Sequence, residues 1–321
     1  MRILITGAFG RLGQACLLEA ARQGHQVNTF DVPSKRNRRA ATKFLEAQAT
    51  GQSGHRSYWG DIRRIDDLES ALEGVDCVIH YAAVLPPVTD DAPELAEEIN
   101  VNGTRNLIQA VASTGRAVAI QYPSSLTVFG IKQELSPPRR VGEPTHATDN
   151  YTDHKLKCEQ ALIESGLPYV IFRIAVSVGA ALQGIDRKTL GSMLGVKADN
   201  RLEYIHPDDV ATAMVNAVGN EEAMGRILLV GGGTSCQVTQ RDLINATLGS
   251  AGLTFDDDEL GSNAYYTDWL DTEESQRILR YQETSFGDFQ EQMHHKLRFV
   301  HPFVRPLAPV IKRVLKQWLG S

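Results

Sequence analysis

Short apolar runs alternate along the chain with longer stretches of helical periodicity. The runs cover residues 3–5, 77–81, 117–122, 169–174 and 227–230, and a further short strand is predicted over residues 26–30. Such continuous runs are typical of strands that are covered on both faces of a sheet. Helical periodicity is clearest over residues 66–73, 93–113 and 151–165. Strands that alternate with helices predict an α/β fold built on a parallel sheet.

A glycine-rich turn joins the first predicted strand to the first predicted helix. It reads Gly7-Ala-Phe-Gly10-Arg-Leu-Gly13 and leads into helical periodicity over residues 14–23. Glycines let the backbone turn tightly and approach a pyrophosphate, which the helix N-terminus then stabilises. A tight turn that binds no ligand is the alternative. We expect a bound dinucleotide, with contacts from Gly7, Phe9, Gly10, Arg11, Leu12 and Gly13.

Asp31 ends the second predicted strand, the place where an acid is expected after a dinucleotide-binding turn. A carboxylate at this position accepts hydrogen bonds from the adenosine ribose and repels a 2′-phosphate, which favours NAD over NADP. Four basic residues follow it: Lys35, Arg36, Arg38 and Arg39. They either form a phosphate clamp, which would admit NADP, or lie solvated on the surface. We expect NAD as the cofactor.

Tyr151 and Lys155 are four positions apart in a predicted helix, so both side chains project from one face. A lysine near a phenol favours the phenolate, and we therefore expect the pKa of Tyr151 to fall below its usual value of about 10. Such a phenol can pass a proton to or from a carbinol oxygen. Ser125 precedes them, where a predicted strand enters a loop, and can hydrogen-bond the same oxygen. The three residues predict a catalytic triad.

Further short motifs follow in order along the chain. They are Gly60-Asp61-Ile62, His80-Tyr-Ala82-Ala83, Asn100-Val-Asn-Gly-Thr104, Arg173 and His206-Pro-Asp-Asp209-Val. With the glycine turn and the triad, they make residues 1–281 resemble the extended short-chain dehydrogenase/reductase family, whose best-known members are NAD-dependent sugar epimerases and dehydratases. The resemblance implies a doubly wound, Rossmann-type sheet of seven strands and a smaller C-terminal substrate lobe. It also implies a homodimer through the helices near residues 100–114 and 151–165.

The resemblance implies roles for individual residues as well. Asp61 and Ile62 would contact adenine, and Ala82 and Ala83 would line the nicotinamide ribose. Asn100 would lie in the cofactor site and support the active-site network. Tyr151 and Lys155 would also contact the cofactor, with Lys155 holding the hydroxyls of the nicotinamide ribose.

Three polar residues are expected to be structural rather than catalytic. His80 ends an apolar run, so we expect a hydrogen-bonded histidine in the core. His206 and Asp209 recur in the family as an element between the lobes, and we expect the same role here.

The chain departs from the family's sugar-processing members around the expected substrate site. Arg173 is followed by Ile-Ala-Val-Ser-Val-Gly179, without the proline, asparagine and Tyr-Gly-Pro of those members, and only 33 positions separate it from His206. We therefore expect an NAD(P)-dependent oxidoreductase of a small, apolar alcohol or ketone, with Leu85-Pro-Pro-Val88 in the pocket wall. An NAD-dependent nucleotide-sugar epimerase or dehydratase, and a non-enzymatic NAD sensor or scaffold, are the alternatives.

Composition narrows the class of protein further. The chain of 321 residues is 42% hydrophobic and 22% charged, which excludes a disordered protein. Its four cysteines are far apart, so we expect reduced thiols, no metal site and a cytoplasmic location. No apolar run is long enough to cross a bilayer as a helix, so we expect no transmembrane helix. The net charge of −6 argues against nucleic-acid binding.

Charge divides the chain into an acidic body and a basic C-terminal tail. Residues 294–321 hold six of the 33 lysines and arginines and no acid, so residues 1–293 carry a net charge of −12. We expect three parts: a dinucleotide-binding domain of residues 1–175 with parts of 200–230, a substrate lobe of residues 176–200 and 231–293, and the tail of residues 294–321.

The tail ends in a predicted amphipathic helix. Its apolar face contains Val310, Ile311, Val314, Leu315, Trp318 and Leu319. Three prolines, at positions 302, 306 and 309, predict an irregular connector before it. The helix either packs on its own body or a partner subunit, or contacts a membrane surface through residues 310–319.

Overall fold

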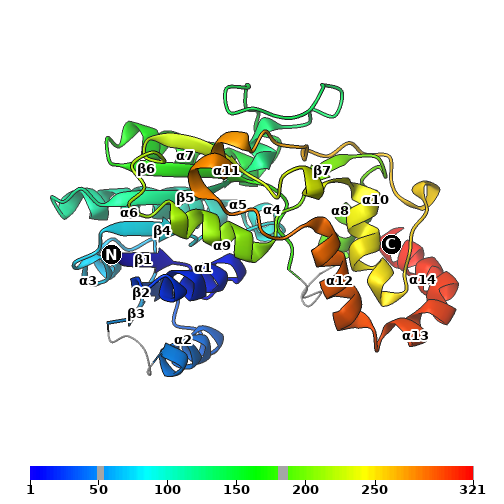
Figure 1. Cartoon of the computed structure of the whole chain (residues 1–321), viewed down its shortest axis with the longest axis horizontal. Helices are drawn as coiled ribbons and strands as arrows, with labels where there is room; N and C mark the ends of the chain where they lie inside the picture. Colours follow the sequence, from blue (N-terminus) through cyan, green and yellow to red (C-terminus); the bar gives the residue numbers. More distant parts are fainter. Residues whose placement is uncertain (49–53, 180–186, 321) are drawn as a thin grey trace.

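The structure, a computed structural model, describes residues 1–48, 54–179 and 187–320 (Figure 1). Its larger domain is built on one sheet of seven parallel strands. In spatial order they are β3 (Arg56–Trp59), β2 (Gln26–Asp31), β1 (Arg2–Thr6), β4 (Cys77–His80), β5 (Ala119–Ser125), β6 (Tyr169–Ile174) and β8 (Arg226–Val230). The predicted doubly wound, Rossmann-type sheet is therefore confirmed.

Helices cover both faces of this sheet. One face carries α1 (Arg11–Arg22), α2 (Lys35–Gln48), α9 (Pro207–Asn216) and α11 (Glu273–Leu279). The other carries α3 (Asp66–Leu72), α6 (Gly103–Ser113) and α7 (Asn150–Glu164). Two apolar clusters, one between each layer of helices and the sheet, form the core of the domain. The strands are buried on both faces, which explains their continuous apolar sequences.

The predicted helix over residues 93–113 consists of three consecutive pieces. They are α5 (Pro93–Glu97), a π-helical turn η1 (Glu98–Asn102) and α6. A short helix, α4 (Val88–Asp91), precedes them. Asn100 lies in the π-helical turn, and π-helical turns frequently occur at functional sites.

A smaller lobe follows the sheet at the side shown on the right in Figure 1. It contains α8 (Arg187–Gly195), an antiparallel pair formed by β7 (Arg201–Glu203) and β9 (Gln237–Thr239), α10 (Gln240–Thr247) and α12 (Phe286–Leu297). The rings of Tyr204, Phe286 and Phe289 pack against one another in its apolar core, with centroids 4.4–5.8 Å apart.

One boundary of the predicted substrate lobe is wrong. Residues 270–281 were expected within that lobe, but Leu270, Ile278, Leu279 and Tyr281 are buried in the core of the larger domain. The reason is that α11 packs beside β8, the last strand of the sheet, and buries its apolar face there.

The C-terminal segment is helical nearly throughout. It consists of α13 (His301–Val304), a 3₁₀ turn η6 (Arg305–Leu307) and α14 (Ala308–Gly320). The prediction of an irregular connector is wrong, because Pro302 and Pro306 lie in the first turns of α13 and η6, where a missing N–H costs nothing. Within the described ranges, no helix is long and apolar enough to span a membrane.

Candidate cofactor and active site

The glycine turn lies between β1 and the end of β4, where the order of strands in the sheet reverses. Gly7 has φ of +63°, and a Cβ there would lie 2.7 Å from the Ala82 nitrogen. A Cβ on Gly13 would lie 2.3 Å from the Gly7 oxygen. Gly10, directly before α1, provides no capping side chain, and the first turn of α1 contains no acid. This end of α1 fits the pyrophosphate of a dinucleotide, as predicted for such a turn.

Asp31 is held beside the glycine turn by backbone hydrogen bonds. Its carboxylate accepts one from the Phe9 N–H at 2.9 Å and one from the Val32 N–H at 2.8 Å. The side-chain amide of Asn37 donates a further hydrogen bond to the Asp31 carboxylate at 3.0 Å. Burial raises the pKa of the Asp31 carboxyl, and these backbone donors oppose that rise. A carboxylate can accept further hydrogen bonds, so Asp31 remains a suitable partner for ribose hydroxyls.

Three of the basic residues after Asp31, Arg36, Arg38 and Arg39, line one cavity together with Phe9 of the glycine turn. Arg36 lies close enough to Asp31 to lower its carboxyl pKa, whereas the Arg38 guanidinium lies 4.9 Å from the centroid of the Trp59 ring.

Two residues expected near adenine follow β3. Asp61 pairs with the Arg63 guanidinium at 2.5 Å. Ile62 is buried against α6, where a Cβ on Gly103 would come within 2.7 Å of it. Ala82 is the second residue after the end of β4 and donates its N–H to the Thr6 hydroxyl at 3.3 Å, and Ala83 is the next residue. The structure therefore brings Ala82 next to the glycine turn.

The side chain of Asn100 is hydrogen-bonded to the loop that follows β4. Its amide oxygen accepts the Val84 N–H at 2.8 Å, and its nitrogen donates to the Val84 carbonyl at 2.9 Å. The same nitrogen lies 3.3 Å from His154 Nδ1 on α7. Asn100 thus supports the site indirectly, because it holds the loop after β4 against α7.

Ser125, Tyr151 and Lys155 meet at the carboxyl end of β5. Ser125 is the last residue of β5, and its hydroxyl oxygen accepts hydrogen bonds from the Thr127 N–H at 3.2 Å and the Thr127 hydroxyl at 2.9 Å. The same hydroxyl is close enough to the Tyr151 phenol to lower the pKa of Tyr151 by hydrogen bonding. Lys155, one turn along α7, donates its ammonium to the Pro123 carbonyl at 2.6 Å. Its nitrogen lies 5.6 Å from the centroid of the Tyr151 ring. The structure therefore brings the three predicted catalytic residues together.

The expected direction of the Tyr151 pKa is wrong for this structure. Burial raises the pKa of the phenol to about 12, and the Ser125 hydrogen bond offsets only part of that rise. Lys155 does not reverse it, because its ammonium is directed at the Pro123 carbonyl and burial lowers its own pKa to about 8. The phenol is therefore protonated at neutral pH and can donate to a carbonyl oxygen.

A buried ion pair supports α7 beneath the triad. The Arg173 guanidinium on β6 donates to the Glu159 carboxylate on α7 at 2.8 and 3.2 Å. The Ser124 hydroxyl, next to Ser125, donates to the same carboxylate. Only 3% of Glu159 and 5% of Arg173 are exposed, so neither charge can turn to solvent.

The three polar residues expected to be structural have structural surroundings. His80 is buried between the hydroxyls of Thr6 and Thr104, at 2.7 and 3.0 Å, and burial lowers its pKa to about 3. His206 caps the N-terminus of α9, and Asp209 accepts the Thr284 N–H at 2.9 Å. These contacts tie α9 to the segment that leads into α12, which confirms the expected link between the lobes.

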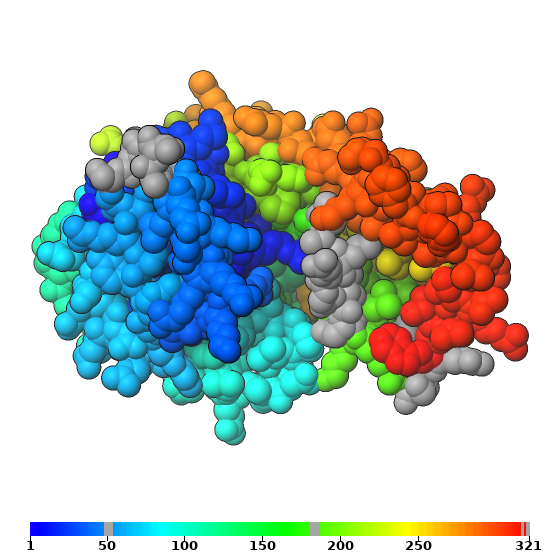
Figure 2. Space-filling model, turned by 90° about the horizontal axis from the view of Figure 1, so that it is seen from below, coloured from blue at the N-terminus to red at the C-terminus, as the bar shows by residue number. Residues whose placement is uncertain are grey.

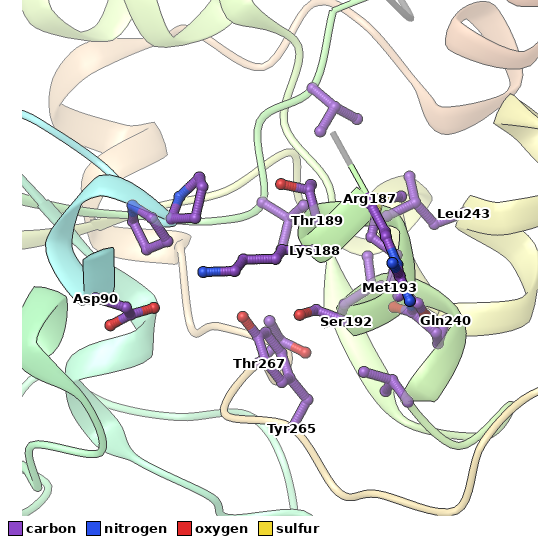
Figure 3. A pocket seen from close by; sticks show the side chains of 17 residues that line it. Asp90, Arg187, Lys188, Thr189, Ser192, Met193, Gln240, Leu243, Tyr265 and Thr267 are labelled. Carbon is purple, nitrogen blue, oxygen red and sulfur yellow. The ribbon is translucent and has the colours of Figure 1, made fainter. Parts of the chain in front are cut away.

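A cavity of about 770 Å³ is lined by residues of both lobes, and its wall includes Tyr265, whose phenol lies close enough to Tyr151 to raise the pKa of that residue (Figure 3). Its walls are mainly apolar. They come from the loop after β4, the segment that follows β6, and from α8, β7 and α10. Pro86 and Pro87, the central residues of the Leu85–Val88 segment, line it. The cavity is much larger than a small alcohol or ketone requires.

A chain of hydroxyls joins this cavity to the helix that carries Tyr151. Tyr265 lines the cavity and donates its phenol proton to the Tyr266 oxygen at 2.9 Å. Tyr266 donates to the Asp149 carboxylate at 2.6 Å. Asp149 is the N-cap of α7 and also accepts the Thr152 N–H at 2.7 Å. The position of the Tyr151 helix is thus tied to the pocket wall.

Several of these residues were missed at the level of sequence. The spacing Asp149-x-x-Thr152 before a helix is a capping signal and could have identified Asp149. Tyr265, Tyr266 and the residues of α8 lie in irregular sequence with no motif, so no pattern indicated them. Among the described residues, no cluster of ligating side chains could hold a metal ion.

Comparison with known proteins assigns the chain to a family. Residues 3–231 match the NAD dependent epimerase/dehydratase family, and the chain belongs to it. The expected family, and an NAD-dependent enzyme as its kind of protein, are thereby confirmed.

Two relatives and two solved structures illustrate the range of this family. A 3-beta-hydroxysteroid dehydrogenase of Mycolicibacterium neoaurum is 26% identical over 226 residues, which cover 64% of this chain and 58% of that protein. The human 3 beta-hydroxysteroid dehydrogenase type 7 is 29% identical over 164 residues, 50% of this chain and 42% of that protein. The chain thus spans about half the length of these relatives.

The two structures are similar over nearly the whole chain. A UDP-glucose-4-epimerase from Stenotrophomonas maltophila with bound NAD and formylated UDP-arabinopyranose has a TM-score of 0.76 at 20% identity, covering 93% of this chain and 98% of that one. A UDP-glucose 4-epimerase from Bifidobacterium longum in complex with NAD⁺ and UDP has a TM-score of 0.73 at 22% identity, covering 94% and 99%. At these identities the likeness establishes the fold alone.

Proposed function

We propose that the chain transfers a hydride between NAD and a secondary alcohol or ketone borne on a bulky apolar skeleton. The observation that carries this proposal is the mainly apolar cavity of about 770 Å³, whose wall includes Tyr265, a close neighbour of Tyr151. It revises the expected substrate from a small molecule to one the size of a fused-ring skeleton. The relatives named as 3-beta-hydroxysteroid dehydrogenases support a substrate of this kind.

In this proposal Tyr151 is the general acid and base. Its protonated phenol donates a hydrogen bond, and then its proton, to the substrate's carbonyl oxygen during reduction, and takes the proton back during oxidation. Ser125 hydrogen-bonds the same oxygen. When bound, NAD supplies the hydride acceptor at its nicotinamide ring. Lys155 would hold the nicotinamide ribose, the glycine turn would hold the pyrophosphate, and Asp31 would hold the adenosine ribose.

A nucleotide-sugar epimerase is the second candidate, because two cations, Arg187 and Lys188, line the same cavity. A diphosphate would need them, yet both are engaged. Lys188 forms an ion pair with Asp91, and the Arg187 guanidinium lies 5.4 Å from the centroid of the Trp318 ring.

Dimerisation through α6 and α7 and a cytoplasmic location remain predictions of the sequence.

A graded panel of alcohols tests the proposed substrate class. We expect NADH formation, measured by absorbance, to rise at least 10-fold in kcat/KM from a single-ring to a fused-ring secondary alcohol, because the larger skeleton fills more of the apolar cavity. UDP-hexoses should give neither NADH nor an epimer. Epimer formation without an alcohol-dependent signal would instead establish the second candidate.

Replacing Asp31 with alanine should reduce the preference for NAD over NADP at least 10-fold. The substitution removes the negative charge that repels a 2′-phosphate and leaves Arg36 nearby to attract one. The measurement is the ratio of the two dissociation constants. Asp61→Asn is the matched control, because adenine is common to both cofactors and the ratio should not change. An unchanged ratio in the Asp31 variant would contradict its assigned role.

A further inference from the structure

A row of large apolar side chains lies exposed along the C-terminal helical segment. Their spacing of four, four, three, four and four positions puts them on one side of the run. We call this row the apolar ridge; with exposed fractions it comprises Phe299 (71%), Phe303 (75%), Leu307 (56%), Val310 (62%), Val314 (56%) and Trp318 (44%). In the space-filling view, this segment (red) forms the end of the molecule remote from the N-terminal strands (Figure 2).

A second apolar stripe of the same segment attaches it to the body. Val304, Ala308, Ile311 and Leu315 are half-buried. Lys312 forms an ion pair with Glu259 at 2.5 Å and lies 5.0 Å from the centroid of the Phe255 ring. The apolar face predicted from the sequence is therefore two faces: one packs on the body, and the apolar ridge stays largely exposed.

Basic side chains accompany the apolar ridge, and no acid does. Lys296, Arg298, Arg305 and Arg313 are exposed, whereas residues 294–321 contain no aspartate or glutamate. In a two-fold dimer through this face, this set of cations would face the same set on the second copy, which like-charge repulsion opposes. The combination of exposed aromatic and aliphatic side chains with cations instead suits the interface of an anionic bilayer.

The apolar ridge is also close to the substrate cavity. Arg187, at the start of α8, lines the cavity and lies 5.4 Å from the Trp318 ring centroid. Leu194 on α8 and Leu315 on α14 line a second, smaller cavity between the two helices. One helix, α8, therefore separates the substrate cavity from the segment that carries the ridge.

We propose that the apolar ridge docks the protein onto an anionic lipid bilayer as an interfacial helix that does not span it. The ridge inserts among the acyl chains near the surface, and Arg298, Arg305 and Arg313 lie at the headgroups. Docking places α8 and the cavity beside the lipid from which an apolar substrate would enter. This last role rests on the proposed function, whereas lipid binding itself does not.

Vesicle sedimentation of the full chain, without NAD or substrate, tests the docking. We expect binding to vesicles of phosphatidylcholine and phosphatidylserine, mixed in a molar ratio of two to one, to be at least 10-fold stronger than to phosphatidylcholine alone. Phe303→Asp/Val310→Asp should weaken it at least 10-fold. Ile131→Asp/Leu135→Asp is the control, because it changes two equally apolar side chains, 53% and 50% exposed, outside the C-terminal segment. The control should bind within twofold of the unaltered chain.

The arginines give an independent variant that keeps the apolar ridge intact. Arg298→Gln/Arg305→Gln/Arg313→Gln should remove most of the preference for vesicles that contain phosphatidylserine. Each basic residue lost should lower the affinity for these vesicles roughly 5-fold. Equal binding to both vesicle types, or a ridge variant that binds like its control, would overturn the proposal. So would a dimer of the unaltered chain that Phe303→Asp/Val310→Asp converts to a monomer. A chain that binds lipid but transfers no hydride would overturn the proposed function alone.

Discussion

Replacing Tyr151 with phenylalanine should lower turnover at least 100-fold and leave the affinity for NAD within about twofold. The substitution removes only the phenolic oxygen, which hydrogen-bonds Ser125 and is positioned to exchange a proton with the substrate. The ring and its position near Lys155 remain. Steady-state kcat at saturating alcohol and NAD, together with a titration of NAD by tryptophan fluorescence, measures both quantities.

Tyr265→Phe is the matched control for that variant. Tyr265 also lines the cavity, but its phenol donates to Tyr266 rather than to Ser125. We expect kcat in this control to stay within 10-fold of the unaltered enzyme. Near-normal turnover in the Tyr151 variant would contradict the assignment of the proton donor, whatever the control does.

Replacing Glu159 with leucine should destabilise the protein by about 3–5 kcal/mol, because it leaves the Arg173 guanidinium buried without its carboxylate partner. For a domain of this size, that loss lowers the Tm by roughly 10 °C. Thermal unfolding followed by circular dichroism measures it. The double variant Glu159→Leu/Arg173→Met should lose less than the single variant, because it removes both buried charges.

Lys157→Met is the matched control, because it removes a solvent-exposed ion-pairing residue from the same helix. Lys157 pairs with Glu97 and Asp153 at 2.8 and 2.9 Å, but its side chain is 40% exposed. Its loss should cost less than about 1 kcal/mol. A Glu159 variant no less stable than this control would contradict the role of the buried pair in supporting α7.

The sequence was sufficient to predict those elements whose residues face one environment throughout. Strands β1, β4, β5 and β6 are buried on both faces and therefore read as continuous apolar runs. β3 was not predicted, because this edge strand has the sequence Arg-Ser-Tyr-Trp and is only half-buried. The glycine turn could be predicted because backbone contacts at Gly7 and Gly13 leave no room for a Cβ.

The rest of the site depends on contacts between distant segments. The cavity wall combines the loop after β4 with α8, α10 and Tyr265, and no local spacing reports their proximity. The Tyr151 pKa was predicted in the wrong direction because the four-residue spacing of Tyr151 and Lys155 does not reveal burial or the Pro123 carbonyl. Likewise, periodicity alone could not separate the two apolar stripes of the C-terminal segment. Which stripe is buried depends on how the segment packs against the rest of the protein.

Hydride transfer from a labelled substrate tests the central claim most directly. The substrate is a fused-ring secondary alcohol that carries deuterium on its carbinol carbon, incubated with the enzyme and NAD. The proposed function predicts NADH one mass unit heavier in mass spectrometry, formed by the unaltered enzyme and reduced at least 100-fold by Tyr151→Phe. Unlabelled NADH, or no NADH from any apolar alcohol while a UDP-hexose is epimerised, would contradict it.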